Sequence, residues 1–183
     1  GCYATGMVAA LFPLVHAKVV PTDYPTVVHA ISGYSGGGKK LIATYESPPS
    51  EDARQQLRGP RLHAFGLQHK HIPEMQKVVG LANAPLFQPM VADYYKGMLV
   101  SVPLLPRLLT RRVSPADVHQ VLSQHYGQTP FVRVMPLGAE RDFATGYLDP
   151  LGCNDTNRLD LFVFGRDEQI AVVARLDNLG KGA

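Results

Sequence analysis

Cysteine is scarce in this chain of 183 residues, which contains only Cys2 and Cys153. Two cysteines in a chain of this length provide no disulfide framework, and without a signal segment they favour the reducing cytoplasm. No apolar run approaches the roughly 20 residues of a membrane-spanning helix. The net charge of +3 is small, and basic pairs such as Lys39-Lys40 are isolated, which argues against a nucleic-acid-binding surface.

The rest of the composition is that of an ordinary folded domain. Hydrophobic residues make up 45% of the chain, which is enough for one core, and the length predicts a single domain over 1–183. Several strand signals with few helices predict an α+β domain rather than a doubly wound dinucleotide fold. We expect a mixed, mostly antiparallel sheet with helices mainly on one face.

Periodicity, caps and breakers place the individual elements. Helices are expected over four ranges: 5–17, 47–57, 74–79 and 114–126. Pro13 ends or kinks the first of these, and Ser114-Pro115 starts the last. Strands are expected over six ranges: 26–31, 86–91, 97–103, 131–135, 159–164 and 169–176. Strands 86–91 and 97–103 are expected to be neighbours in one sheet, and the last two strands to form a hairpin.

Cys2 stands at the start of an apolar stretch, because the chain reads Gly-Cys-Tyr-Ala-Thr-Gly over 1–6 and then becomes hydrophobic. Unpaired N–H groups at a helix N-terminus favour a thiolate, and such sites lower a cysteine pKa from about 8.5 to between roughly 3.5 and 7.5. The alternative is a small buried hydrophobic residue. We interpret Cys2 as a candidate nucleophile and Cys153 as inert.

A glycine-rich segment, Ser-Gly-Tyr-Ser-Gly-Gly-Gly-Lys-Lys over 32–40, follows the strand expected at 26–31. Its backbone N–H groups are suited to an anion, and Lys39 or Lys40 adds positive charge. The spacing is neither that of a P-loop nor that of a dinucleotide-binding fingerprint. A flexible hairpin is an equally good interpretation.

His69-Lys70-His71, followed by Glu74, gathers two imidazoles, a cation and a carboxylate within six residues. This combination suits an acid/base catalyst or a site for an anionic substrate. A zinc site is the less favoured alternative because no other Cys/His pair completes it, and a polar surface loop is the other. The remaining histidines are interpreted as structural: His16, His29, His63, His119 and His125.

Polar turns at 154–158 and 177–181 offer amides for a carboxamide or phosphate, although such residues more often satisfy their own backbone. No order of serine, histidine and aspartate, and no Gly-x-Ser-x-Gly elbow, supports a serine hydrolase.

Four motifs occur in one order along the chain, and together they resemble the N-acetyl-gamma-glutamyl-phosphate reductase family in its shorter form. They read Gly-Cys-Tyr-Ala-Thr-Gly over 1–6, Ser-Gly-Tyr-Ser-Gly-Gly-Gly-Lys over 32–39, His-Lys-His-Ile-Pro-Glu-Met over 69–75 and Leu-Asp-Asn-Leu-Gly-Lys-Gly-Ala over 176–183. The resemblance spans the whole chain. It implies a fold like the C-terminal domain of glyceraldehyde-3-phosphate dehydrogenase.

The resemblance also implies a reaction, the NADPH-dependent reduction of N-acetyl-glutamyl phosphate to the semialdehyde, with phosphate release, in arginine biosynthesis. Cys2 would be the nucleophile that forms a thioester, and His69 the acid/base, with His71 as the alternative. Lys70 and Lys39 would meet the substrate phosphate. Residues implied to face the cofactor or phosphate are Ser32, Gly33, Ser35, Gly36 and Asn178.

The family's nucleotide-binding Rossmann domain and closing C-terminal helix are not recognised in this sequence. The chain is therefore expected to be the catalytic and dimerisation domain of a homo-oligomer, binding NADP poorly by itself and carrying a Cys2 less reactive than in a complete enzyme. Two alternatives stay open, a dimerisation or interaction module without activity and a cysteine hydrolase that uses Cys2 and His69.

Overall fold

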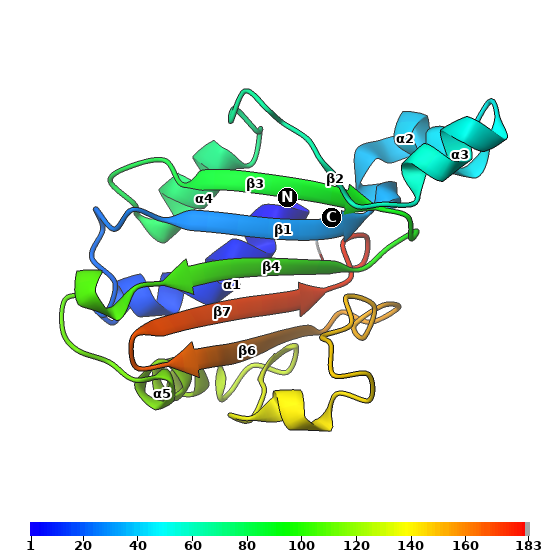
Figure 1. Ribbon diagram of the computed structural model, residues 1–183. Coiled ribbons are helices and arrows are strands. Elements are labelled where there is room, and N and C mark those ends of the chain that lie inside the picture. Colours follow the sequence, from blue (N-terminus) through cyan, green and yellow to red (C-terminus); the bar gives the residue numbers. More distant parts are fainter. Residues whose placement is uncertain (182–183) are drawn as a thin grey trace.

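The computed structural model describes residues 1–181 and is built on one seven-stranded sheet with the order β2-β3-β1-β4-β7-β6-β5 (Figure 1). The strands are β1 Val27–Gly33, β2 Arg61–Leu62, β3 Leu86–Ala92, β4 Met98–Leu104, β5 Val132–Val134, β6 Leu159–Arg166 and β7 Gln169–Leu176. The β1–β3 and β5–β6 pairs are parallel and the others are antiparallel. The expected mixed, mostly antiparallel sheet is confirmed, as is the hairpin of β6 and β7.

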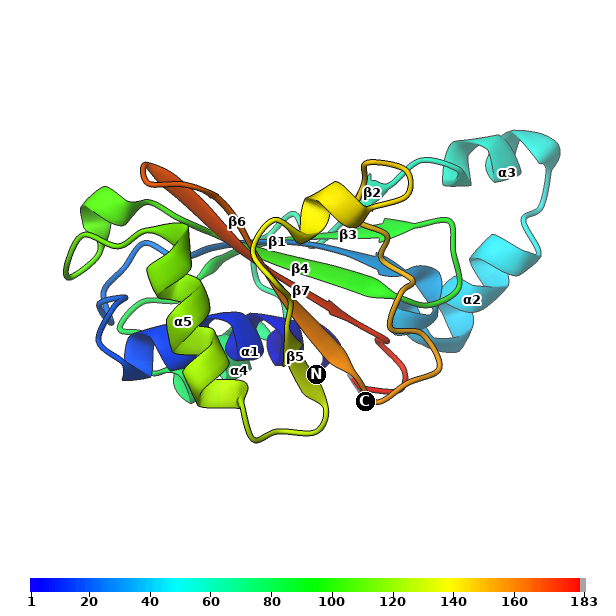
Figure 2. The ribbon, with the colours of Figure 1, turned by 90° about the horizontal axis from the view of Figure 1, so that it is seen from below.

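Five α-helices accompany the sheet within residues 1–181: α1 Cys2–His16, α2 Gly38–Glu46, α3 Glu51–Leu57, α4 Ile72–Val79 and α5 Pro115–Tyr126. Short 3₁₀ turns occupy η1 Tyr34–Gly37, η2 Pro106–Leu108 and η3 Ala139–Asp142. Figure 2 shows α1, α4 and α5 on one face of the sheet, while α2 and α3 project beyond the end where β1 finishes. No helix in the described part of the chain is long and apolar enough to cross a membrane.

Helix α1 lies between α4 and α5 in the helix layer of that face, contacting both helices as well as β4 and β7. Gly6 permits this close approach, since a Cβ there would lie 2.7 Å from Cγ2 of Val100. The core combines α1 residues such as Met7 and Leu11 with the inward side chains of the central strands, all of them buried. Packing of α1 against β4 therefore fixes where its first turn, with Cys2, is presented.

Pro13 lies inside α1, which continues past it to His16, close to the end expected at 17. A proline at this position leaves the carbonyl of Ala9, four residues earlier, without its helical donor. The hydroxyl of Tyr126, in α5, donates to that oxygen at 2.9 Å. A contact between helices thus replaces the missing backbone hydrogen bond.

Two helix starts follow the local signals closely. Ser114 caps α5 in a capping box, accepting from the backbone N–H of Asp117 while the Asp117 carboxylate accepts from the N–H of Ser114. Ser50 caps α3 by accepting from the N–H of Ala53 at 3.1 Å. Helix α3 starts only at Glu51, and not at 47, because two prolines precede Ser50.

The expected adjacency of β3 and β4 is wrong, because β1 lies between them. The connection over 93–97 passes around the end of β1, and carbonyls of Tyr94, Tyr95 and Gly97 accept hydrogen bonds from the N–H groups of residues 33–35. Gly33 is required at this crossing, since a Cβ there would lie 2.5 Å from the Tyr95 carbonyl oxygen. The glycine-rich segment likewise forms η1 and the start of α2 rather than a flexible hairpin.

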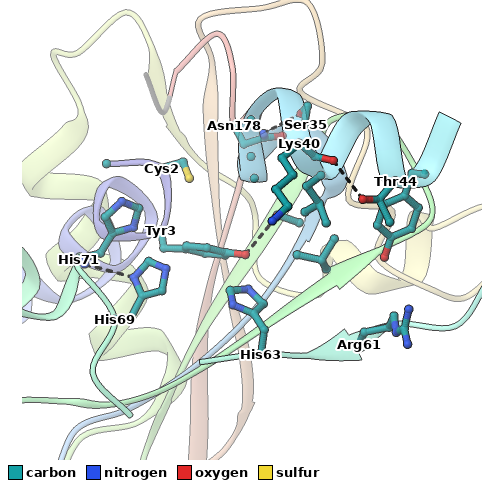
Figure 3. A pocket seen from close by; sticks show the side chains of 18 of the residues that line it. Cys2, Tyr3, Ser35, Lys40, Thr44, Arg61, His63, His69, His71 and Asn178 are labelled. Carbon is teal, nitrogen blue, oxygen red and sulfur yellow. Dashed lines mark hydrogen bonds between the residues drawn. The ribbon is translucent and has the colours of Figure 1, made fainter. Parts of the chain in front are cut away.

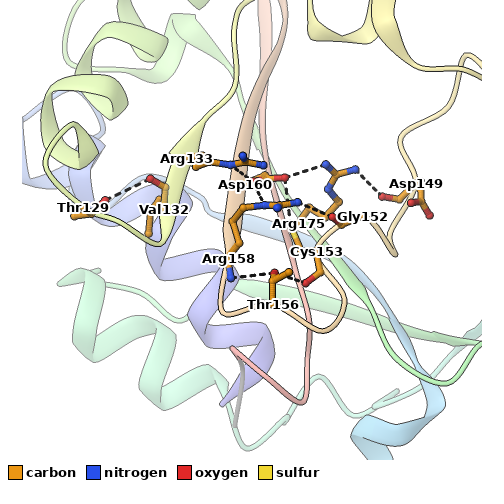
Figure 4. Close-up of polar contacts among 10 residues, drawn as sticks. All are labelled: Thr129, Val132, Arg133, Asp149, Gly152, Cys153, Thr156, Arg158, Asp160 and Arg175. Carbon is orange, nitrogen blue, oxygen red and sulfur yellow. Dashed lines mark hydrogen bonds and ion pairs between the residues drawn. The ribbon is translucent and has the colours of Figure 1, made fainter.

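A buried ionic cluster joins β5, β6 and β7 (Figure 4). The Asp160 carboxylate is fully buried and pairs with Arg133 at 3.1 Å, Arg158 at 3.0 Å and Arg175 at 2.9 Å. Burial acts to raise the pKa of Asp160, but the hydrogen bonds from Arg175, Arg133 and Cys153 hold it below the ordinary value. Cys153 is buried and donates to Asp160, which agrees with its interpretation as an inert thiol.

Candidate active site

A cavity of about 890 Å³ lies where the start of α1, the end of β1 and the excursion through α2 and α3 meet (Figure 3). It collects residues from segments far apart in the sequence: the first turn of α1, residues 32–45, the strand β2, the histidine segment 69–71 and Asn178. Of the site residues predicted from the sequence, these line the cavity: Cys2, Ser32, Ser35, Gly36, His69, Lys70, His71 and Asn178.

Two predicted site residues stand elsewhere. Gly33 is not among the lining residues, because it packs against the connection over 93–97. Lys39 is not among them either, and Lys40 lines the cavity instead.

Cys2 is the first residue of α1, which confirms that it stands at a helix N-terminus. The expected lowering of its pKa is wrong, however, because burial raises the pKa of the thiol despite the opposing effects of nearby N–H groups and Lys70. Desolvation of a thiolate in this half-buried position outweighs the helix-end effect. Cys2 is therefore a protonated thiol that needs a proton acceptor before it can attack an electrophile.

The two histidines of the motif lie against each other, with ring centroids 4.7 Å apart. The backbone N–H of His71 donates to Nδ1 of His69 at 3.1 Å. Because Nδ1 accepts this bond, neutral His69 carries its proton on Nε2, so that Nε2 is a hydrogen-bond donor. Burial, with smaller effects of His71, His63 and Lys70, lowers the pKa of His69 to about 4. His69 is thus neutral near pH 7.

Tyr3 is a site residue that the sequence analysis missed. Its ring is buried and meets the rings of His69, His71 and Phe87, with centroids 5.7, 5.9 and 5.1 Å away. Its hydroxyl shares a 3.0 Å hydrogen bond with Oγ of Ser32, and burial raises its pKa to about 12. Tyr3 is therefore a neutral side chain whose contacts hold the histidine segment in place relative to α1 and β1. Only its position next to Cys2 hinted at this role.

His63 is the second missed residue, since it was interpreted as structural. It lines the cavity, its ring centroid is 6.0 Å from that of His69, and its buried Nε2 has no hydrogen-bond partner within residues 1–181. Burial lowers its pKa. The available signal was the grouping of three histidines between positions 63 and 71, of which we used only two.

Asn178 connects the glycine-rich segment to the last turn of the chain. Its Oδ1 accepts from the N–H of Gly97 at 2.8 Å, and its Nδ2 donates to Oγ of Ser35 at 3.0 Å. The preceding Asp177 accepts from the N–H groups of Leu179 and Gly180, as expected of a turn that satisfies its own backbone. Within residues 1–181, the Asn178 Nδ2 donates no second hydrogen bond. The end of this motif, 182–183, lies outside the described residues.

No group of three histidine, cysteine or acidic side chains gathers in a metal-binding arrangement within residues 1–181. Among the residues that the structure describes, the cationic side chains lining the cavity are Lys40, Arg61 and Lys70, and no aspartate or glutamate lines it. The arrangement can therefore hold an anionic ligand next to a cysteine and a neutral histidine donor.

The low histidine pKa values predict acid sensitivity. Unfolded histidines titrate near 6.5, whereas His69 titrates at about 4 and the pKa values of His63 and His71 are also lowered, chiefly by burial. The unfolded chain therefore binds more protons between these values, so the free energy of unfolding decreases as the pH falls from about 6.5 toward 4. Urea unfolding at about pH 7 and about pH 5 measures this loss. We expect the His69→Gln variant to lose less than the wild type; equal losses would show that His69 does not contribute.

A family model described as the semialdehyde dehydrogenase dimerisation domain matches residues 2–178. Over the whole chain, the identity is 42% with N-acetyl-gamma-glutamyl-phosphate reductase 2 of Pseudomonas putida and 40% with the N-acetyl-gamma-glutamyl-phosphate reductase of Burkholderia cenocepacia, of which the chain covers 57% and 58%. The chain thus spans less than two thirds of the length of these relatives.

Two solved structures have a similar fold over the whole chain. Aspartate semialdehyde dehydrogenase II of Vibrio cholerae gives a TM-score of 0.72 at 16% identity with 57% of that chain covered, and the Francisella tularensis aspartate semialdehyde dehydrogenase gives 0.66 at 13% with 60% covered. These structures support the expected fold class, and the family match supports homo-oligomerisation. The chain belongs to the semialdehyde dehydrogenase dimerisation-domain family.

Proposed function

We propose that this domain carries the catalytic residues for reducing N-acetyl-glutamyl phosphate to N-acetyl-glutamate semialdehyde, with release of phosphate, in arginine biosynthesis. The observation that carries the proposal is the meeting of Cys2, at the first turn of α1, with His69 and His71 in one cationic cavity. The names of relatives about 40% identical over the whole chain support the same reaction.

The chemistry follows from the protonation states. In the proposed step the Cys2 thiol loses its proton to a neighbouring base, the role we assign to His71, and its sulfur attacks the acyl carbon. The bond to the phosphate oxygen breaks, phosphate leaves with the bonding electron pair, and a thioester remains on Cys2. Lys70, beside both histidines, and Lys40 would attract the phosphate group, and Lys40 takes the place expected of Lys39.

The thioester must then accept a hydride, which a bound nicotinamide cofactor supplies, NADPH by family resemblance. The Nε2–H of His69 would donate to the thioester oxygen as negative charge develops there. The resulting alkoxide re-forms the carbonyl of the aldehyde as its bond to Cys2 breaks, and the sulfur leaves as a thiolate. His69 therefore stabilises both the formation and the collapse of this intermediate.

The cavity fits a nicotinamide on its glycine-rich side. A Cβ added at Gly36 would meet only Nδ2 of Asn178 at 3.5 Å and Oγ of Ser32 at 3.6 Å, so the backbone here is open to a flat ligand. Ser35 and Asn178, already bonded to each other, present polar groups at the same place. We propose that Ser32, Ser35, Gly36 and Asn178 contact the cofactor, while Gly33 positions them.

Because the chain spans 57% to 58% of its relatives, we further propose that a nucleotide-binding domain and a closing helix lie outside this sequence, and that the complete enzyme is cytoplasmic. The test is phosphate-dependent, NADP-linked oxidation of N-acetyl-glutamate semialdehyde by the full-length protein. Turnover by the full-length protein but not by the isolated chain is expected. An inactive full-length protein favours a pure interaction module, and thioester hydrolysis without cofactor favours a cysteine hydrolase.

The sheet face opposite α1 supports homo-oligomerisation. Side chains on β1 and β4 alternate, with Val100 and its neighbours buried against α1 while Ile31 and Leu99 on the other face are half-buried and paired across the two strands. Figure 1, which looks onto this face, shows no helix in front of β1 and β4. We propose that a second copy of the chain packs here.

This interface predicts that Leu99→Asp weakens self-association, because a buried unpaired carboxylate is costly. We expect the dimer dissociation constant to rise about 30-fold or more, measured by light scattering or sedimentation over a concentration series. Val78→Asp is the control, since Val78 is an exposed aliphatic side chain on α4, in the layer on the opposite face of the sheet. Equal effects of the two variants, or none for Leu99→Asp, would place the interface elsewhere.

A further inference from the structure

The ring of Tyr3 is a contact surface shared by both histidines of the motif, and Figure 3 shows it beside them. Tyr3 is buried in the first turn of α1. Its ring meets the His69 ring almost at a right angle, with an interplanar angle of 85°. Phe87, fully buried on β3, meets His69 at the same angle, with ring centroids 5.2 Å apart. The His69 ring therefore packs against aromatic rings from two separate elements, α1 and β3.

The hydroxyl of Tyr3 is anchored at the end of β1. Oγ of Ser32, which is also buried, lies 3.0 Å from this hydroxyl and donates to the carbonyl of Gly33 at 3.1 Å. Because a serine hydroxyl has a single hydrogen, Tyr3 is the donor in its bond to Ser32. The carbonyl of Met90 is a second and longer acceptor for Tyr3, at 3.4 Å. The ring is thus fixed at both ends, by α1 and by β1.

Protonation of His69 would break the hydrogen bond that orients its ring. Neutral His69 accepts at Nδ1 from the N–H of His71, and Nε2 already carries the one proton of the neutral ring. A second proton can therefore be added only at Nδ1, where it would face the N–H of His71. Contact with water would favour the charged ring. Aromatic rings that cover His69 consequently preserve its orientation as well as its neutral state.

Burial is the largest influence on the pKa values of both histidines, and it lowers both. The other titratable or charged groups that face the pair are His63, Lys70, Glu74 and the amino group of Gly1. All of these except Glu74 lower the histidine pKa values further. On α1, Cys2 and Tyr3 add no charge near pH 7, because burial raises the pKa of each. Removal of a covering ring should therefore act mainly through water.

We propose that Tyr3 is a positioning residue for the two catalytic histidines. Its ring, fixed by the hydrogen bond to Ser32, orients His69 and His71 and keeps water away from them. Tyr3 thereby sets the lower end of the pH range in which the site works. This inference rests on the proposed function and adds to it a residue that acts through the histidines.

The first test replaces the ring, with Tyr3→Leu in the full-length enzyme. NMR titration of labelled histidines follows His69, whose signal is the one that disappears in His69→Gln. In the wild type we expect His69 to titrate at about 4. In Tyr3→Leu its pKa should rise by at least about one unit toward the ordinary 6.5, because water reaches the ring. The acid limb of the pH–rate profile should move to higher pH by the same amount.

The second test removes only the anchor. Tyr3→Phe keeps the ring, so the pKa of His69 should stay within about half a unit of the wild-type value, while kcat falls about threefold through the lost hydrogen bond. If the bond to Ser32 carries this loss, Tyr3→Phe should have no further effect on kcat in a Ser32→Ala background. Additive losses would show that Ser32 does not act through Tyr3.

Tyr24→Leu is the matched control for the loss of a buried tyrosine. Tyr24 is buried, does not line the cavity, and accepts from the N–H of Leu105 at 2.8 Å. Tyr24→Leu should destabilise the fold but leave the titration of His69 and the pH–rate profile unchanged. An equal shift in this control, or an unshifted His69 in Tyr3→Leu, would show that Tyr3 has no positioning role.

Two further outcomes separate this inference from the proposed function. A wild type without turnover would count against the proposed reaction, yet the NMR titration would still decide the role of Tyr3. A wild-type His69 that titrates near 6.5 would overturn the inference even if Tyr3→Leu does not fold, because the ring would then not keep water from the histidine.

Discussion

Replacing Cys2 with serine should lower kcat by at least about 10⁴-fold in the full-length enzyme. The proposed reaction passes through a covalent bond to the Cys2 sulfur, and a serine hydroxyl is a much weaker nucleophile and a poorer leaving group at neutral pH. The Cys2 thiol lies in the first turn of α1, and burial raises its pKa. Attack on the acyl carbon therefore includes deprotonation of the thiol by a neighbouring base. The NADP-linked assay in the phosphate-dependent direction measures the loss.

The matched control is the same change at the other cysteine. Cys153 is buried beside Asp160 and does not line the cavity, and a serine hydroxyl there can donate to the same carboxylate. Cys153→Ser should therefore keep activity within about threefold of the wild type, since surface and isosteric changes away from a site have small effects. Substantial activity in Cys2→Ser, or equal losses in both variants, would remove Cys2 from the role of nucleophile.

Elements governed by short-range signals could be predicted from the sequence. The start of α5 follows from a capping residue, a proline and an acidic residue within four positions, and the β6–β7 hairpin follows from two apolar runs around a polar turn. In these cases the groups that decide the structure are neighbours in the chain. The structure confirms them almost residue for residue.

The order of the sheet could not be predicted in the same way. β1 enters between β3 and β4 because the connection over 93–97 wraps around its end and supplies carbonyls to residues 33–35. These contacts join segments about 60 residues apart. For a similar reason the sequence could not show how α1 accommodates Pro13, because the group that satisfies the Ala9 carbonyl comes from Tyr126 in another helix.

The candidate site likewise divides into residues that local motifs identify and residues whose roles depend on tertiary contacts. Motifs placed Cys2, His69, His71 and Asn178, and the structure brings all four to one cavity. Tyr3 and the cavity-facing side of β2 escaped notice because their roles depend on which segments meet in space. The pKa of Cys2 was misjudged because a helix N-terminus is visible in the sequence, whereas the burial that opposes it is a tertiary property.

His69→Ala should lower kcat by about 10² to 10⁴-fold, the usual contribution of a positioned proton donor. The reason is the fixed tautomer: the N–H of His71 occupies Nδ1 of His69, which leaves Nε2–H as the donor to the developing oxyanion. A glutamine at this position also carries an N–H donor at a similar distance from the backbone. His69→Gln should therefore retain more activity than His69→Ala, by about tenfold.

Comparing His69→Ala with His69→Gln distinguishes two roles for His69: donating a hydrogen bond, and transferring a proton as a general acid/base. If His69 must gain and lose a full proton, glutamine cannot replace it, and both variants should fall equally and lose the same limb of the pH–rate profile. If His69 acts as a neutral donor, His69→Gln should keep a wild-type pH profile above about pH 5, since the wild-type ring is already neutral there. His16→Ala, at the exposed far end of α1, serves as the control for histidine loss alone. If His71 is the base that deprotonates Cys2, as proposed, His71→Ala should slow alkylation of Cys2, whereas His69→Gln should leave that rate close to the wild type.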